Sequence, residues 1–355
     1  MKKTFTIITL LTISTIAFSQ QLHITQFATL THNDTVTGVW YGSNALNSAY
    51  NSAVAEDVIT LSPGDFNAVT RLNKAITIRG AGMQYDSVAQ TGPTYINNRF
   101  SIEVNSGVLK MEGLYCTADW VVYRTAYSPQ FSKCRFVSLR RTCYNYYGLT
   151  NPIFTNCIIG TWDGSNMAVN AMFVNSVILN SMAGSGSGIY DDYSNVNSWG
   201  GCGISTSFGV SADVYYNCII GISPTLTNNK RNIVNCITFS SDTTQGSAAN
   251  VYNTVGINDS SNFYTITSDH GNTNMSSLEA IFKTFRGTYT AGETFELTDE
   301  AAATYLGSDG TQVGIYGGSA VFNPKATDMR IRKYSVGFYS DENGQLKITT
   351  ELENE

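Results

Sequence analysis

The sequence predicts an all-β fold in which short strands stack as the coils of a solenoid. The chain of 355 residues contains 31 glycines and 21 tyrosines, and only 14% of its residues are charged. This composition favours strands and tight turns over long helices or disorder. A short motif also recurs about twenty residues apart with no helical pattern between its copies. A period of this length indicates one coil of a β-solenoid for each copy.

The N-terminus carries the pattern of a secretory signal peptide. Two lysines precede an apolar run, residues 5–18, that is too short to span a bilayer. Small side chains at Ala17 and Ser19 predict cleavage before Gln20, so residues 1–19 form the expected signal peptide. The protein is therefore expected to be secreted, or to reside at the cell surface or in the periplasm. No membrane span is expected in the rest of the chain.

The repeated motif reads aromatic or apolar, any residue, Asn, small residue, and then two mostly apolar residues. Stacked coils turn each motif position into a ladder of like side chains. The ladder Phe131, Phe154, Phe173 and Tyr215 is expected inside, and the Asn ladder at a sharp corner where the backbone is left-handed. In the weaker first copy, Glu112 takes the Asn place. The clear copies are residues 131–136, 154–159, 173–178, 215–220 and 233–238, and the weaker ones are 111–115, 195–200 and 251–256.

The cysteines follow the same repeat. Four of the seven, Cys134, Cys157, Cys218 and Cys236, occupy the small position of the motif, where serine also occurs. We expect buried, stacked thiols. Disulfides between neighbouring coils remain an alternative, because the coil spacing falls within the range of disulfide Cα separations. No cysteine lies two to four residues from another cysteine or a histidine, so no metal site is expected.

Several segments resemble right-handed parallel β-helix proteins of the pectate-lyase-like superfamily, of the type exported by Bacteroidetes. Residues 46–53, 57–66 and 76–82 are similar to the cap helix and first coil of that family. Residues 294–298 and 307–318 are similar to its closing segment. The resemblance implies a right-handed, single-stranded parallel β-helix and no particular enzyme family. It implies no activity, because the family contains lyases, hydrolases, epimerases, adhesins and many members with no assigned role.

The domain prediction adds elements at both ends of a β-helix that spans residues 20–324. An amphipathic helix near residues 45–53 is expected to cover the first coil, since an open strand edge recruits other chains. A capping box at residues 276–279 predicts a short helix through Phe285. Residues 325–355 alternate around a turn, which predicts a β-hairpin tail. The tail is interpreted as an end cap, a small appended sheet, or a secretion or anchoring element.

Two apolar residues follow the small position in several motif copies, as in Ile158-Ile159, Val177-Ile178 and Ile219-Ile220. Strand alternation can turn only one residue of each pair inward. The other residues form an outward apolar stripe that needs a cover. We expect that cover to be the 325–350 tail or another protein.

Aromatic and polar residues concentrate in three segments that are expected in consecutive coils. Flat rings beside Asp, Asn and Arg suit the recognition of sugars, provided that the three segments leave the coils at the same corner. Mutual packing of the rings to close the loops is the competing interpretation. The candidate ligand-binding residues are Arg140, Arg141, Tyr144, Tyr146, Tyr147, Trp162, Asp163, Asp191, Asp192, Tyr193 and Trp199.

The predicted function is non-catalytic contact with a polysaccharide or another cell-envelope ligand. One alternative is a polysaccharide lyase acting on uronic-acid polymers, with an arginine neutralising the acid. The arginines considered for that role are Arg124, Arg135, Arg140 and Arg141. Another is a structural or adhesive surface protein that binds a protein partner, through the apolar stripe for example. No cofactor is expected, because the carboxylates that a calcium-dependent lyase needs form no coil-to-coil ladder. A net charge of −6 disfavours nucleic acid as a partner.

Overall fold

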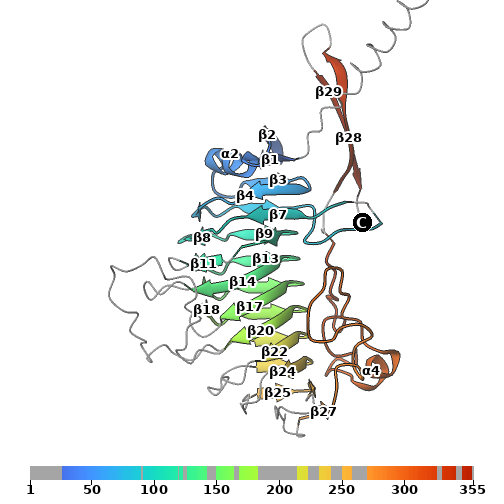
Figure 1. The fold of residues 1–355 in the computed structure, drawn as a ribbon. Coiled ribbons are helices and arrows are strands. Elements are labelled where there is room, and N and C mark those ends of the chain that lie inside the picture. Colours follow the sequence, from blue (N-terminus) through green and yellow to red (C-terminus); the bar gives the residue numbers. More distant parts are fainter. Residues whose placement is uncertain are drawn as a thin grey trace, which may run out of the picture.

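The computed structural model describes residues 26–88, 91–118, 120–122, 126–141, 149–163, 168–182, 214–222, 232–240, 250–257, 270–325, 330–340 and 346–353. These residues form a column of stacked parallel strands, which confirms the predicted β-solenoid (Figure 1). The described part of the chain has two helices, α2 (Ala45–Ser52) and α4 (Asp299–Thr304). Neither is long or apolar enough to cross a membrane.

Three sheets form the walls of the column. The eleven-stranded sheet has the order β2 (Thr35–Tyr41), β1 (Phe27–His32), β3 (Val58–Leu61), β6 (Thr77–Arg79), β9 (Lys110–Glu112), β13 (Gln130–Ser132), β16 (Ile153–Thr155), β19 (Met172–Val174), β21 (Val214–Tyr216), β23 (Asn232–Val234) and β25 (Asn250–Tyr252). A three-stranded sheet contains β12 (Ala126–Tyr127), β15 (Leu149–Thr150) and β18 (Ala168–Val169).

The thirteen-stranded sheet forms the remaining wall. Its main path is β27 (Thr273–Met275), β26 (Val255–Ile257), β24 (Ile237–Ser240), β22 (Ile219–Ile222), β20 (Val177–Met182), β17 (Ile158–Asp163), β14 (Arg135–Arg141), β10 (Tyr115–Cys116), β7 (Thr94–Asn97) and β4 (Gly64–Asn67). Beside this path lie β11 (Trp120–Val122), β8 (Ser101–Ile102) and β5 (Arg71–Leu72).

The predicted Asn corner joins the eleven-stranded sheet to the thirteen-stranded sheet. Its residues have positive φ angles, from 45° at Asn175 to 55° at Asn235, and Lys133 adopts 51° at the same place. Asparagine suits this corner because it tolerates the left-handed region better than other side chains that carry a Cβ. In the first copy the corner residue is Gly113, with φ of 63°. The assignment of Glu112 was wrong, because Glu112 pairs with Ser132 inside the strands.

One predicted copy is not a separate coil. β19 pairs directly with β21, with Phe173 opposite Tyr215, so a single coil runs from one corner at Asn175 to the next at Asn217. The motif copy at residues 195–200 lies outside the described residues, and its assignment as an additional rung was wrong. The strand pairing leaves no place for it in this sheet.

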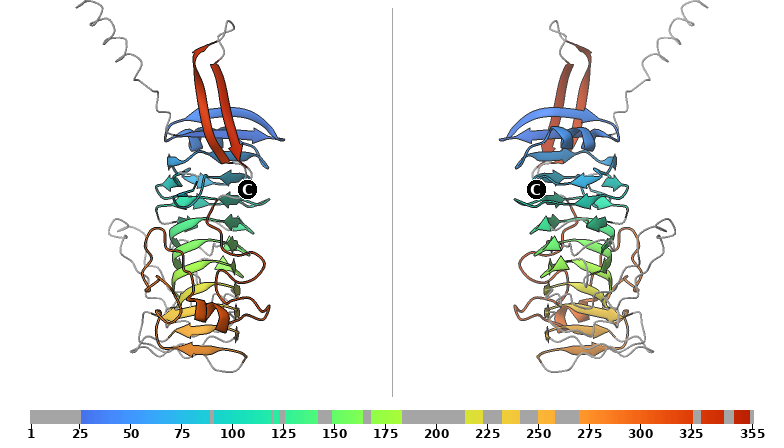
Figure 2. Two further views of the ribbon diagram at one scale, coloured as in Figure 1. Left: turned by 90° about the vertical axis from the view of Figure 1, so that its right-hand side faces the viewer. Right: turned by 90° about the vertical axis from the view of Figure 1, so that its left-hand side faces the viewer.

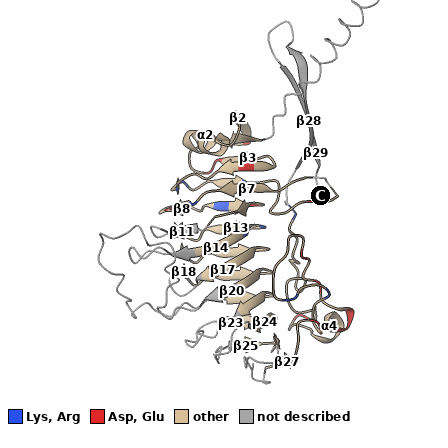
Figure 3. Ribbon diagram, in the orientation of Figure 1, with Lys and Arg blue, Asp and Glu red and all other residues tan. Residues whose placement is uncertain are grey.

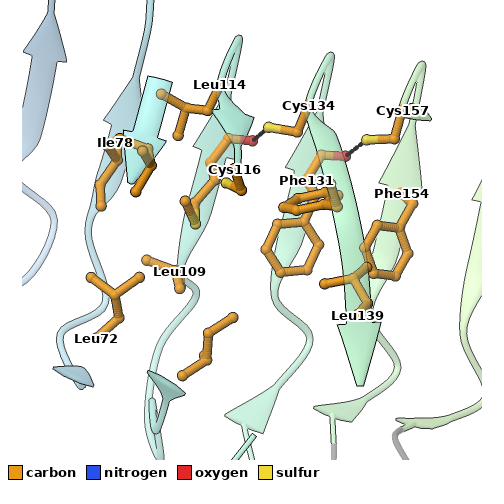
Figure 4. Packing of buried hydrophobic residues seen from close by; sticks show 14 of the residues in the cluster. Leu72, Ile78, Leu109, Leu114, Cys116, Phe131, Cys134, Leu139, Phe154 and Cys157 are labelled. Atoms are coloured by element: carbon orange, nitrogen blue, oxygen red, sulfur yellow. Dashed lines mark hydrogen bonds between the residues drawn. The ribbon is translucent and has the colours of Figure 1, made fainter. Parts of the chain in front are cut away.

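The interior is built from two of the predicted ladders (Figure 4). The rings of Phe131, Phe154, Phe173 and Tyr215 stack at centroid distances of 4.8 to 4.9 Å. Beside them run the free, fully buried thiols of Cys134, Cys157, Cys218 and Cys236. Cys116 is also buried and forms no disulfide, whereas Cys143 and Cys202 lie outside the described residues. The stacked-thiol prediction is confirmed for the cysteine ladder.

Helix α2 closes the first coil, as the sequence predicts. Its residues Ala45, Leu46, Ala49 and Tyr50 are buried against the core. Lys74 then fixes the C-terminal end of the helix, because its Nζ donates to the carbonyl oxygens of Tyr50 at 2.6 Å and Ala53 at 2.7 Å. A cation at this end also interacts favourably with the helix dipole.

The outward apolar stripe exists and is covered, but the predicted covers were wrong. Its residues Ile158, Val177, Ile219, Ile237 and Val255 are at most 2% exposed. They belong to a core cluster shared with Phe282, Phe285, Phe295, Leu297, Val313, Ile315 and Phe322. We call residues 278–322 the cover segment. It runs back along the column (Figures 1 and 2), so this stripe offers no surface to a protein partner.

The cover segment is held to the Asn corner by hydrogen bonds. Asn175 Nδ2 donates to the carbonyl oxygens of Ile315 at 2.9 Å and Gly317 at 2.7 Å. Asn235 Oδ1 accepts from the Ser308 amide at 3.0 Å. The segment begins with a turn rather than the helix predicted through Phe285, since Phe282 forms a β-bridge with Leu297. The ladder amides therefore bind this segment, and the corner is a seam between two parts of the fold.

The C-terminal tail forms the predicted hairpin. Strands β28 (Arg330–Ser340) and β29 (Leu346–Glu353) pair antiparallel and make a two-stranded sheet of their own. The hairpin stands at the end of the column that carries β1 and β2 (Figure 2). Lys325, which lies shortly before the hairpin, forms an isolated antiparallel β-bridge with Gly82.

Candidate functional site

The candidate site lies at one edge of the thirteen-stranded sheet, where several strands end together. Leu139 pairs with Trp162, Trp162 pairs with Ser181, and Val122 pairs with Arg141. Strands β11, β14, β17 and β20 therefore finish at nearly the same level. We call this the loop edge. The residues that follow these strands, 142–148, 164–167 and 183–213, lie outside the described part of the chain but begin at this common edge.

Three of the predicted site residues occupy the loop edge. Arg140 and Arg141 end β14, and Asp163 ends β17. Arg140 and Asp163 each follow a residue of the Leu139–Trp162 pair, so they stand at equivalent positions in adjacent coils. Adjacent parallel strands lie roughly 4.8 Å apart. Arg140 and Asp163 therefore lie near the ends of adjacent strands at the same edge of the sheet, and their role in binding stays a prediction.

The other predicted residues divide into two groups. Tyr144, Tyr146 and Tyr147 follow β14 in sequence, and Asp191, Asp192, Tyr193 and Trp199 follow β20, all outside the described residues. Trp162 is described and was wrongly included. Its side chain is fully buried. Its ring contacts Phe154 at a centroid distance of 5.5 Å and Phe173 at 5.0 Å, so no face is available for a sugar.

Among the arginines considered for a lyase, Arg135 is occupied by packing. Its guanidinium lies 4.2 Å from the ring centroid of Tyr115 and 4.4 Å from that of Tyr289. Tyr289 belongs to the cover segment, where burial raises the pKa of its hydroxyl and Arg135 opposes that rise. Arg135 thus helps to attach the cover segment. Arg140 and Arg141 remain as the arginines placed at the loop edge, and Arg124 lies outside the described residues.

The sequence did not predict a polar cluster at the first hairpin. His32 Nδ1 lies 2.6 Å from Asp57 Oδ1, and Asn33 Nδ2 lies 3.1 Å from His32 Nε2. The Asp57 side chain is only 3% exposed and also accepts from the Val54 amide. These contacts fasten the β1–β2 turn to the start of the first coil. No local signal pairs His32 with Asp57, because the two are 25 residues apart and meet only when β1 aligns with β3.

Charged side chains are sparse along the described strands (Figure 3). Where the chain is described, no three His, Cys, Asp or Glu side chains gather as a metal ion would require. One small apolar pocket lies beneath α2 and is lined by Leu46, Leu72, Phe100 and their neighbours. It lies within the core and offers no polar group for chemistry.

No protein-family model matches the chain, and no curated protein is similar to it in sequence.

Proposed function

We propose that this protein is exported and contacts a polysaccharide of the cell envelope through the loop edge, without catalysing its cleavage. The observation that carries the proposal is the common register at which β11, β14, β17 and β20 end. Segments rich in tyrosine, tryptophan, aspartate and asparagine therefore start from one edge. A ligand that lies along the column can meet several of them at once.

The chemistry of these residue types suits a sugar polymer. Arg140 and Arg141 supply fork-shaped donors that match carboxylates and hydroxyls, and Asp163 supplies an acceptor in the next coil. Tyrosine and tryptophan rings stack on the apolar faces of sugars. Two adjacent arginines favour an acidic polymer over a neutral one. Binding at this edge is therefore expected to weaken as salt concentration rises.

A glycan array that includes uronic-acid polymers tests this proposal. The double variant Arg140→Ala/Arg141→Ala is expected to weaken binding of acidic glycans at least tenfold. Tyr144→Ala and Trp199→Ala are expected to weaken it by lesser factors. Arg99→Ala, which removes an exposed arginine elsewhere, is the matched control. Unchanged binding of acidic glycans by the double variant would show that the loop edge is not the binding site.

A lyase that acts on uronic-acid polymers is the second candidate, and the neighbouring positions of Arg140 and Asp163 favour it over other enzymes. The arginine would neutralise the uronate, and the carboxylate would remove the proton beside it. Incubation with polygalacturonate and measurement of absorbance at the band of the unsaturated product tests this directly. A rise that Asp163→Asn abolishes would replace the binding proposal with the lyase.

The third class, a structural or adhesive protein with a protein partner, would have to use a surface other than the covered stripe. Failure of both sugar assays would favour it.

Export rests on the N-terminal pattern of residues 1–19. Mass spectrometry of the protein secreted by its native host is expected to find an N-terminus at Gln20. Recovery of an intact Met1 from the cell interior would contradict export.

A further inference from the structure

The outer face of the eleven-stranded sheet carries an uncovered stripe without charges. In each strand from β16 to β25 the middle residue points inward, as Phe154 and Phe173 do, and the residues on either side point outward. One outward row contains Val174, Tyr216, Val234 and Tyr252 at paired positions. We call this face, formed by the outward positions of β16, β19, β21, β23 and β25, the tyrosine stripe.

The tyrosine stripe is open to solvent, unlike the stripe on the thirteen-stranded sheet. Tyr252 is 38% exposed and Met172 is 43% exposed. The other described side chains of its outward rows are partly exposed. The ring of Tyr252 packs edge-to-face on His270 at a centroid distance of 4.8 Å, which holds the ring in place. Partly exposed tyrosine, valine and methionine side chains therefore lie on this face, where aromatic rings can contact a ligand.

The charge pattern excludes a charged ligand. None of the outward positions in the five strands of the stripe is Lys, Arg, Asp or Glu, and the adjoining strand β13 contributes Gln130 and Ser132. Charges begin again only at β9 and β6, where Arg79 and Glu112 pair at 3.4 Å. An acidic polymer would therefore find no counter-charge on the tyrosine stripe.

The shape of the stripe excludes a stable dimer of this chain. Strands of three residues make it roughly 10 Å wide, and five coils make it roughly 24 Å long. That footprint is a few hundred Å², whereas a stable protein interface buries about 800 Å² on each partner. A narrow, flat, uncharged surface instead fits a linear ligand that runs along the column.

The spacing of two tyrosines along the stripe indicates the repeat length of a ligand that would fit it. Tyr216 and Tyr252 stand in the same row with Val234 between them, so they are two coils, roughly 9.6 Å, apart along the axis. Two sugar units of an extended β-1,4-linked glycan span a similar length. Such a chain can place the apolar face of every second sugar on a ring.

We propose that the tyrosine stripe is a second glycan-binding site and that its ligand is a neutral, extended polysaccharide chain lying along the solenoid axis. This site is separate from the loop edge. It does not depend on the loop-edge proposal, because it uses other residues, another sheet and a ligand without charge.

Titration of the full chain with cellohexaose and chitohexaose, and with hexagalacturonate as the acidic contrast, tests the proposal. The neutral oligosaccharides are expected to bind. Tyr216→Ala and Tyr252→Ala should each raise their dissociation constants about threefold to tenfold, as expected for the loss of one stacked ring. Tyr252→Phe should retain binding, because it keeps the ring. Arg99→Ala, which lies outside both proposed sites, should leave neutral binding unchanged.

Three outcomes would overturn the proposal. The first is that no neutral oligosaccharide binds the full chain. The second is that neutral binding is insensitive to both tyrosine variants in protein whose unfolding temperature is unchanged. The third is a dimer in sedimentation that Tyr252→Ala dissociates, which would assign the stripe to a second copy of the chain. The loop-edge proposal is tested by a different measurement, namely the binding of hexagalacturonate and its loss in the Arg140→Ala/Arg141→Ala variant.

Discussion

At the scale of single residues, the small position after each Asn corner explains why cysteine is used so often. Cys157 Sγ donates to the carbonyl oxygens of Thr155 and of Phe131 in the preceding coil, at 3.4 and 3.5 Å. Ser176 makes the same pair of contacts through its hydroxyl. The Ser176 hydroxyl also accepts from the Cys157 amide at 3.1 Å. The position therefore needs a small side chain that can bond the backbone of its own coil and of the coil before it.

Ionisation of these thiols is predicted to destabilise the protein at high pH. Burial raises the pKa of Cys157 to about 12 and holds those of Cys134 and Cys236 well above their ordinary value. Thiols in the unfolded chain ionise near pH 8.5, so the folded state holds more protons above that pH. The contribution of the buried, protonated thiols to the free energy of unfolding is therefore complete below about pH 8.5. The free energy of unfolding should fall by up to about 1.4 kcal/mol per pH unit for each thiol as the pH rises toward 12.

Denaturant unfolding between pH 8 and pH 11 measures this loss. Cys157→Ser is the matched variant, because Ser176 shows that a hydroxyl satisfies the same position. The variant should show a shallower decline with pH by about one thiol's contribution. Equal slopes in the two proteins would contradict the assignment of the decline to the ladder.

Trp162→Ala is predicted to affect stability rather than binding. The ring is fully buried between Phe154 and Phe173, so its removal leaves a cavity. Such truncations cost about 3 to 5 kcal/mol of the free energy of unfolding. Tyr127→Ala is the control, since Tyr127 is 52% exposed and its loss should change stability by about 0.5 kcal/mol or less. A stable Trp162→Ala protein with weakened glycan binding would show that the ring is exposed after all.

At the scale of elements, the cover segment and the Asn corner depend on each other. The segment supplies the apolar side chains that bury the stripe of the thirteen-stranded sheet. In return the corner supplies amides that bond carbonyl oxygens in the segment. Gly318 shows how closely the two approach, because a Cβ there would lie 2.3 Å from Asn217 Nδ2. A side chain at this place would push the segment away from the corner.

Asn175→Gly is predicted to loosen the cover segment without straining the corner. Glycine accepts the positive φ of 45° at this residue, so only the amide contacts with Ile315 and Gly317 are lost. Leaving buried carbonyl groups unsatisfied costs about 1 to 3 kcal/mol. Limited proteolysis should cleave within residues 278–322 faster than in the parent protein. Asn151→Gly is the control at the other corner, where the exposed Asn151 accepts from Asn170. Its cleavage rate in that segment should match the parent.

At the scale of the whole molecule, the column is closed at its first coil and extended by an appended hairpin. Helix α2 packs over the first coils, and β1 and β2 continue the eleven-stranded sheet by antiparallel pairing. Among the described residues, β28 and β29 pair only with each other. The hairpin therefore adds no strand to the solenoid.

Truncation after Lys325 is predicted to leave the solenoid intact. The bridge between Gly82 and Lys325 is retained, and no strand of the column loses a partner. The unfolding midpoint followed by circular dichroism should match that of the full chain. A clearly lower midpoint would show that the hairpin stabilises the column and is an end cap rather than an appended sheet.

Much of the fold can be predicted from the sequence because stacking repeats each local choice. The motif around Asn156, Asn175 and Asn235 reveals the corner, the inward rings and the thiol ladder, since each depends only on position within a coil. The assignments of Glu112 and of residues 195–200 failed because a corner can be glycine and coils differ in length. The candidate site was predictable only in part. Trp162 follows an apolar pair near a polar segment, and nothing local shows that its side of the strand faces inward.

The sequence by itself determined the solenoid, its cap helix and the need to cover an outward apolar stripe, because alternation and periodicity are local properties of a strand. Tertiary structure decided which segment provides the cover, where His32 finds Asp57, and which face of the column stays open. These contacts join residues far apart in the chain, such as Asn175 and Ile315, and no local pattern relates their positions. They form only once the coils have stacked and the chain has returned along them.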